Sequence, residues 1–538
     1  MPATPLFPSI DYAAVRQRLL AHEETALVDV REEDPFAQAH PLWAANLPLS
    51  QLELLAWNRI PRRDTLIVLY GAFEGRDLAP RAAERLAALG YTDVRLLAGG
   101  LDGWCAAGGE LFRDVNVPSK SFGELVEAKR HTPSLAAEEV RALLEAKADV
   151  VVLDARRFDE YQTMSIPSAT SVPGAELVLR VRALAPDPAT RVIVNCAGRT
   201  RSIIGTQSLV NAGIPNPVAA LRNGTIGWTL AGQVLDRGAG RRGSLVAASS
   251  PGQRAEAAAS ARRVADRAGV RRLSPEGLAA LDVPDRTLYR LDVRTPEEYA
   301  AGHLPGFASA PGGQLVQETD HHAPVRGARF VLDDDDGVRA NMSGSWLAQM
   351  GWEVYVLDGL APGSRHATGP WRVPTPPTPA VATVAPAELA RWLAEPAQAA
   401  ALQVLDFAAS ASYVQRHVPG AWFVIRAQLA QALARIPRAV RYVLTCGSDP
   451  LARYAAPEVA ALTGAEVIVL EGGNDAWIAA GLPLEQGEAR LANPRTDRYR
   501  RPYEGTDAPR EAMQAYLDWE FGLVEQLGRD GTHHFEVI

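Results

Sequence analysis

Short runs of apolar, often β-branched residues alternate along most of the chain with longer stretches of helical character. One such unit has strands at 150–153 and 192–194, a helix candidate over 203–212 and a short strand over 218–221. This alternation predicts a largely parallel sheet with helices on both faces, an α/β fold. Ligands of such sheets bind at the carboxyl ends of the strands. Residues that directly follow a strand are therefore the first candidates for chemistry.

Two patterns recur and divide the chain into four units. An apolar strand that ends in aspartate occurs at Asp29, Asp154, Asp292 and Asp406. A closing element with glycine and tryptophan ends units one, two and four at Trp104, Trp228 and Trp477, whereas unit three keeps Val356–Leu360 without the tryptophan. The repeat is too long for a solenoid and indicates tandem domains.

The joins between the units are visible in the composition. Residues 236–270 are rich in Arg, Ala, Gly and Ser, which predicts a charged, partly helical linker, and the prolines of 370–379 predict a stiff spacer. The aromatic tail contains a helix candidate over 509–527 and is expected to pack on a domain. We expect domains at 1–118, 130–240, 265–372 and 380–486, followed by a C-terminal helical tail at 487–538.

Composition narrows the function classes. A chain of 538 residues is too long for one core, and its net charge of 55 − 63 = −8 gives no global basic field for nucleic acid or a membrane surface. Three cysteines, Cys105, Cys196 and Cys446, are too few and too scattered for a disulfide framework, which suits a reducing compartment. Without a signal peptide or a long apolar run, the expected location is the cytoplasm, with no nucleic acid and no membrane as partners.

Cys196 stands at the carboxyl end of a strand and just before a helix. Converging N–H groups at the helix start and the nearby arginines would favour the thiolate, lower the pKa of the thiol and hold an anionic substrate. Gly198 is expected to permit the tight curl of the loop. We predict Cys196 as nucleophile and Arg201 as its catalytic partner, with substrate bound by Ala197, Gly198, Arg199, Thr200 and Ser202.

These residues resemble the rhodanese (thiosulfate sulfurtransferase) family. Its six-residue loop that begins with cysteine is matched by Cys196–Arg201, and its Asp-Val-Arg strand end by Asp29–Arg31 and Asp292–Arg294. Its Gly-His-Ile-Pro-Gly-Ala turn is closely matched by Gly302–Phe307 and Arg416–Ala421. The resemblance extends over about residues 10–485, nearly everything except the tail. It implies four tandem rhodanese-like domains, each a largely parallel sheet flanked by helices.

The resemblance also implies a sulfur relay through a Cys196 persulfide, with no metal and no cofactor. The donor would be a small anion such as thiosulfate. The acceptor would be cyanide, a thiol or a protein cysteine.

The equivalent positions of the other units differ. Unit one has Gly71 and unit three has Asp334, which replaces the nucleophile in a run of aspartates expected to be a solvated loop, so both units are expected to be inactive. Unit four has Cys446, but Leu451 stands where Arg201 would and the loop is about one residue longer, with Asp449 and Pro450 in it. Cys446 with Arg453 is thus either a second site or, as we prefer, a decayed one.

Two other functions are alternatives to this prediction. Phosphatases on this fold need five residues between cysteine and arginine, whereas Cys196 and Arg201 are separated by four and Cys446 and Arg453 by six. A non-enzymatic adaptor, in which the modules bind partners and Cys196 is a regulatory thiol, stays open because two or three of the four units lack the full loop.

Overall fold

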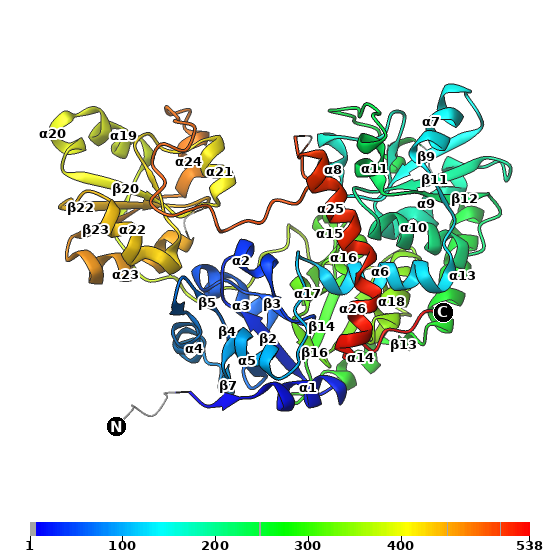
Figure 1. Ribbon diagram of the computed structural model, residues 1–538, viewed down its shortest axis with the longest axis horizontal. Coiled ribbons are helices and arrows are strands. Elements are labelled where there is room, and N and C mark those ends of the chain that lie inside the picture. The colour runs from blue at the N-terminus through cyan, green and yellow to red at the C-terminus, as the bar shows by residue number, and fades with distance from the viewer. Residues whose placement is uncertain (1–6, 247–248, 449, 506) are drawn as a thin grey trace.

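The computed structural model describes residues 7–246, 249–448, 450–505 and 507–538. Four α/β domains follow one another along the chain, and Figure 1 shows the fourth set apart from the others. Each is built on its own sheet, in which the strands of that domain run parallel. The α/β fold predicted from the alternating pattern is confirmed.

Domain 2 shows the shared plan. Its strands lie in the order β10-β9-β11-β12-β8, so β9 and β11, which end beside each other, occupy the middle of the sheet. Both central strands are apolar and largely buried, as a strand covered on both faces must be. Its elements are β8 (Ser134–Leu135), α7 (Ala137–Glu145), β9 (Val150–Asp154), α8 (Phe158–Thr163), β10 (Thr170–Ser171), α9 (Leu177–Leu184), β11 (Arg191–Asn195), α10 (Thr200–Asn211), β12 (Val218–Leu221) and α11 (Gly224–Leu230).

Domains 3 and 4 repeat this order as β13-β18-β17-β14-β15 and β19-β23-β22-β20-β21. The predicted linker between the two halves is partly helical, because it contains α13, which packs on both α9 and α18. Domain 3 and its linker contain α12 (Gly243–Val246), α13 (Pro251–Arg267), β13 (Arg271–Leu273), α14 (Pro275–Leu281), β14 (Leu288–Asp292), α15 (Pro296–Ala301), β15 (Ala308–Ser309), α16 (Gly312–Gln317), α17 (Thr319–His322), β16 (Val325–Arg326), β17 (Arg329–Asp333), α18 (Arg339–Gln349) and β18 (Glu353–Leu357). Domain 4 contains β19 (Thr383–Val384), α19 (Pro386–Ala394), α20 (Pro396–Ala399), β20 (Leu402–Asp406), α21 (Ser410–Gln415), β21 (Trp422–Phe423), α22 (Leu429–Arg435), β22 (Arg441–Thr445), α23 (Pro450–Thr463), β23 (Glu466–Leu470) and α24 (Gly473–Ala479).

Domain 1 has the same parallel core, β1-β7-β4-β2, with β3 also on β2. One strand in its sheet comes from domain 3: β16 pairs antiparallel with β2, Val325 opposite Ala26. The two domains therefore share hydrogen bonds across their boundary. The elements of domain 1 are β1 (Ser9–Ile10), α1 (Tyr12–Leu20), β2 (Thr25–Asp29), α2 (Glu33–Gln38), β3 (Ala45–Asn46), α3 (Leu52–Arg59), β4 (Leu66–Tyr70), β5 (Ala72–Phe73), β6 (Arg76–Asp77), α4 (Ala79–Ala88), β7 (Val94–Leu97) and α5 (Gly100–Ala106).

Two segments outside the sheets join the domains. Helix α6 (Val117–Arg130) connects domains 1 and 2 and packs on α10, and most of it is buried. The tail returns from domain 4 and crosses the molecule, as the red ribbon of Figure 1 shows. The single helix expected over 509–527 is in fact two, α25 (Arg510–Phe521) and α26 (Leu523–Asp530), because the chain is broken at Gly522. The tail packs against α6 and α11, as its aromatic content predicts.

Across the described ranges, no helix is long and apolar enough to cross a membrane. The same ranges contain no group of three or more His, Cys, Asp or Glu side chains arranged to hold a metal ion.

Candidate active site

The Cys196 loop connects β11 to α10 and is fastened to the start of α11. The N–H groups of Thr225 and Ile226 donate to the carbonyl oxygens of Cys196, at 2.9 Å, and Ala197, at 3.0 Å. Gly224, with φ +55°, allows this close approach, because a Cβ there would collide with the Cys196 carbonyl oxygen. The closing glycine-tryptophan element of the repeat thus supports the loop directly.

The Cys196 thiol is buried, with an exposed fraction of 2%. It donates a hydrogen bond to Ser202 Oγ at 3.5 Å. Burial raises the pKa of the Cys196 thiol, and the charge of Arg201 and the hydrogen bonds of Ser202 offset only part of that effect. The prediction of a lowered thiol pKa is therefore wrong, because desolvation outweighs the loop's positive field.

Both arginines of the loop are engaged by carboxylates. Arg201 forms two hydrogen bonds to Glu160 on α8, at 2.7 and 2.8 Å. Although burial alone would raise it, Arg201 and its neighbours lower the pKa of Glu160 to about 2. Arg199 forms a similar fork with Glu124 on α6, at 2.7 and 2.8 Å. No sequence pattern indicated these partners, because Glu160 and Glu124 lie 41 and 75 residues before the arginines that they bind.

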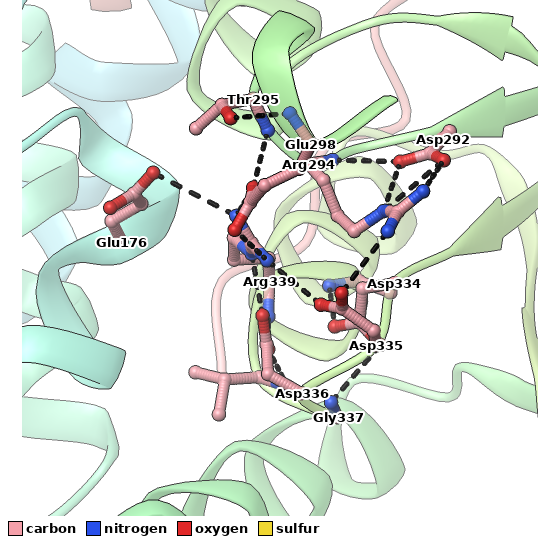
Figure 2. Close-up of polar contacts among 12 residues, drawn as sticks. Glu176, Asp292, Arg294, Thr295, Glu298, Asp334, Asp335, Asp336, Gly337 and Arg339 are labelled. Carbon is pink, nitrogen blue, oxygen red and sulfur yellow. Dashed lines mark hydrogen bonds and ion pairs between the residues drawn. The ribbon is translucent and has the colours of Figure 1, made fainter. Parts of the chain in front are cut away.

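The corresponding loop of domain 3 shows what the cradle can hold (Figure 2). Asp334, in the cysteine position after β17, accepts hydrogen bonds from the N–H groups of Gly337, at 3.0 Å, and Ala340, at 2.8 Å. Asp336 accepts from the N–H groups of Val338, at 2.7 Å, and Arg339, at 3.0 Å. The loop N–H groups of domain 3 are thus occupied by carboxylates of the loop itself.

The expectation of a solvated aspartate run is correct for Asp335, which is exposed, but wrong for Asp333 and Asp334, which are buried. Asp333 receives a fork of hydrogen bonds from Arg365 at 2.7 and 2.9 Å. The carboxyl oxygens of the two buried residues are thus held by an arginine and by loop N–H groups. Because Val338 and Arg339 occupy the positions of Thr200 and Arg201, domain 3 also indicates where an anionic oxygen fits in the loop of domain 2.

The two remaining loops differ in opposite ways. Gly71 follows β4 as predicted, and a Cβ there would stand 2.5 Å from the Val30 side chain, so the position has no room for a nucleophile. Cys446 is buried after β22, and its carbonyl oxygen accepts from Asn474 N–H at 2.8 Å, the same fastening as in domain 2. Arg453 lies within α23, beyond the position of Arg201, and Asp449 lies outside the described residues.

The tail covers the Cys196 loop. Helix α25 brings Tyr516 and Glu520 against Gly198, where an ideal Cβ would lie 3.3 Å from the tyrosine ring and 3.4 Å from Glu520 Oε2. Gly198 does not adopt a positive φ. The loop therefore does not use the left-handed freedom of this glycine, whose small size makes room for the tail.

Fold and site together define a class of protein built from tandem α/β domains. In each domain a loop connects a central strand to a helix, and in domain 2 this loop carries a buried thiol and an arginine that ends it. The sequence profile of the rhodanese-like domain family matches residues 13–107, 136–231, 278–359 and 387–480. These four matches cover more than half of the chain, which belongs to the rhodanese-like family.

A solved structure supports this assignment over nearly the whole chain. The chain is 69% identical to a thiosulfate sulfurtransferase from Pseudomonas aeruginosa, over 99% of this chain and 100% of that one, with a TM-score of 0.95. A rhodanese-like domain from Anabaena is 27% identical, over 20% of this chain and 79% of that one, with a TM-score of 0.18. A rhodanese-related protein from Thermoplasma volcanium is 19% identical, over 19% and 97%, with a TM-score of 0.17. No curated protein gave a significant match.

Proposed function

We propose that the chain is a sulfurtransferase that carries sulfur as a persulfide on Cys196. The observation that carries this proposal is the position of Cys196, the one cysteine of the four loops that combines a full-length cradle with an arginine at its end. The similarity to the Pseudomonas aeruginosa thiosulfate sulfurtransferase supports it over nearly the whole chain.

The reaction has two steps. The Cys196 thiolate attacks the sulfane sulfur of thiosulfate, the bond to the sulfonate sulfur breaks, and sulfite leaves with the bonding electron pair. The terminal persulfide sulfur then bonds to an acceptor nucleophile such as cyanide. Thiocyanate leaves, and the Cys196 thiolate returns. A low-molecular-weight thiol or a protein cysteine would accept sulfur in the same way.

The loop stabilises the charge in both steps. The backbone from Ala197 to Ser202 would hold the donor's oxygens and the terminal persulfide sulfur, as the filled cradle of domain 3 suggests. Arg201 contributes a positive field next to the sulfur, fixed in place by Glu160. Arg199, held by Glu124 on α6, shapes the loop rather than binding the donor. No metal or organic cofactor is needed for these steps.

Intact mass measurement after thiosulfate treatment tests the assignment. The wild type and Cys446→Ser are expected to gain one sulfur atom, released again by cyanide, while Cys196→Ser gains none. An unchanged gain in Cys196→Ser would refute the role of Cys196, and loss of the gain in Cys446→Ser would give Cys446 a part in the relay. If wild-type protein forms the persulfide but does not turn over with any small acceptor, the adaptor function is favoured instead.

A further inference from the structure

One carboxyl group of the tail is sealed against the Cys196 loop without a role in the steps above. Glu520, near the end of α25, has an exposed fraction of 1%, and its Oε2 faces Gly198. The next residue, Phe521, places its ring 4.3 Å from the Arg199 guanidinium. Helix α25 therefore fixes Glu520 beside the loop that would receive the sulfur donor.

The hydrogen bonds of Glu520 are incomplete. Its Oε1 accepts from the Tyr516 hydroxyl at 2.9 Å, while its buried Oε2 has no hydrogen-bond partner among the described residues. A buried ionised oxygen without a partner is costly, whereas a protonated one is a donor that lacks only its acceptor. Glu520 Oε2 is thus an unused polar position that faces the loop.

Burial favours the protonated form of Glu520, while the nearby charges act in both directions: Glu124 raises its pKa, and Lys120 and Arg199 lower it. Helix α6 contributes Lys120, which is paired with Asp114 at 2.6 Å, and Glu124, which is paired with Arg199. The other titratable groups are Tyr516 on α25 itself, Tyr503 beside it and the Cys196 thiol, and α11, which also packs on α25, carries none. Burial, with a contribution from Glu124, raises the pKa of Glu520 to about 8.

Beyond its backbone N–H groups, the loop offers few side-chain donors to the oxygens of the sulfur donor. The fork of Arg199 is taken by Glu124 and that of Arg201 by Glu160, so neither guanidinium offers a free pair of N–H groups to a second anion. A neutral carboxyl group can donate to an anion without bringing a charge of its own.

We propose that Glu520 is a specificity-determining residue for the sulfur donor: its neutral carboxyl group donates a hydrogen bond from Oε2 to an anionic oxygen of the donor bound at the Cys196 loop. This inference rests on the proposed sulfurtransferase function. It gives the tail, which lies outside the four repeated domains, a direct part in recognising a donor with sulfonate-like oxygens. Once Glu520 ionises it loses the proton it donates and repels the donor.

The test measures persulfide formation in a single turnover, read by intact mass, against thiosulfate concentration from about pH 6.5 to about pH 9.5. For the wild type, the half-saturating concentration is expected to rise about tenfold per pH unit above about pH 8, as Glu520 ionises. E520Q keeps a neutral hydrogen-bond donor at every pH, so its half-saturating thiosulfate concentration changes by no more than about twofold over this range. E520A lacks the donor and is expected to need about tenfold more thiosulfate at pH 7, with no rise above pH 8.

The matched control is Glu525→Gln, on the exposed face of α26, which is expected to follow the wild type at every pH. A pH dependence in E520Q equal to that of the wild type, or wild-type affinity in E520A, would overturn the inference. If alanine loosens the tail, seen as a lowered thermal transition, the isosteric E520Q decides alone. Failure of the proposed function is distinct, because it would show as persulfide formation in Cys196→Ser.

Discussion

Replacing Gly224 by alanine places a methyl group against the backbone of the Cys196 loop. Its Cβ would lie 2.7 Å from the Gly198 carbonyl oxygen and 2.8 Å from the Ala197 carbonyl carbon, where ordinary contacts begin at 3.4 Å. These neighbours are backbone atoms and cannot rotate away, so the loop must shift by roughly 1 Å. A displacement of that size at a reacting group costs about 100-fold in rate, or about 2.7 kcal/mol of transition-state stabilisation.

The same substitution also carries a backbone penalty that must be separated from the clash. Gly224 has φ +55°, and a side chain in this left-handed region costs roughly 1–2 kcal/mol of stability. Gly232, in the turn after α11, has φ +74° but nothing within 4 Å of its ideal Cβ. Gly232→Ala therefore reproduces the backbone strain without touching the loop.

The assay is kcat/KM for sulfur transfer from thiosulfate to cyanide, with the thermal transition measured on the same samples. Both variants are expected to melt at lower temperature, and only Gly224→Ala to lose about 100-fold in kcat/KM. Wild-type kcat/KM in Gly224→Ala, or equal losses in the two variants, would show that α11 does not hold the loop in its working position.

Three further outcomes are expected. In a Cys196→Ser background, Asp334→Cys alone gains no sulfur from thiosulfate, because Asp336 still fills the cradle of domain 3, whereas adding Asp336→Gly allows a gain visible by intact mass. Glu160→Gln lowers the free energy of unfolding by about 3 kcal/mol at pH 7, since the pKa of Glu160 falls from 4.5 to about 2 on folding. In urea unfolding, the difference in stability between wild type and variant shrinks as the pH drops from 4.5 towards 2. Burial raises the pKa of Cys196, so in the folded protein the rate of its alkylation by a neutral reagent, followed by mass, continues to increase above pH 9. In the denatured protein the rate levels off at a lower pH.

Most of the fold could be predicted from the repeated local patterns in the sequence. The strand predicted over 192–194 lies within β11. The helix predicted over 203–212 matches α10 except that it lacks the first three residues and extends one residue further. These elements are readable because each signals itself through adjacent residues: apolar runs, turn glycines and strand-end aspartates. The place of the loop between a strand and a helix, and of Cys196 at its start, follows from the same local signals.

What the sequence could not predict depends on segments far away along the chain. Glu124 on α6 and Glu520 on α25 reach the loop from opposite sides in sequence, and neither helix belongs to a repeat. The raised pKa of Cys196 was not predicted either, since its burial in the folded chain leaves no mark in the loop's own residues. The strand β16, which completes the sheet of domain 1 from within domain 3, is likewise a long-range pairing.

The position of α25 on domain 2 also determines the order in which the loop forms and is covered during synthesis. A ribosome releases the residues of domain 2 long before those of the tail, and domains fold as they emerge. A nascent chain can therefore form the Cys196 loop before the tail that covers it has been made. Helix α25 is translated after all four domains, so the covered form of the loop arises only late in synthesis.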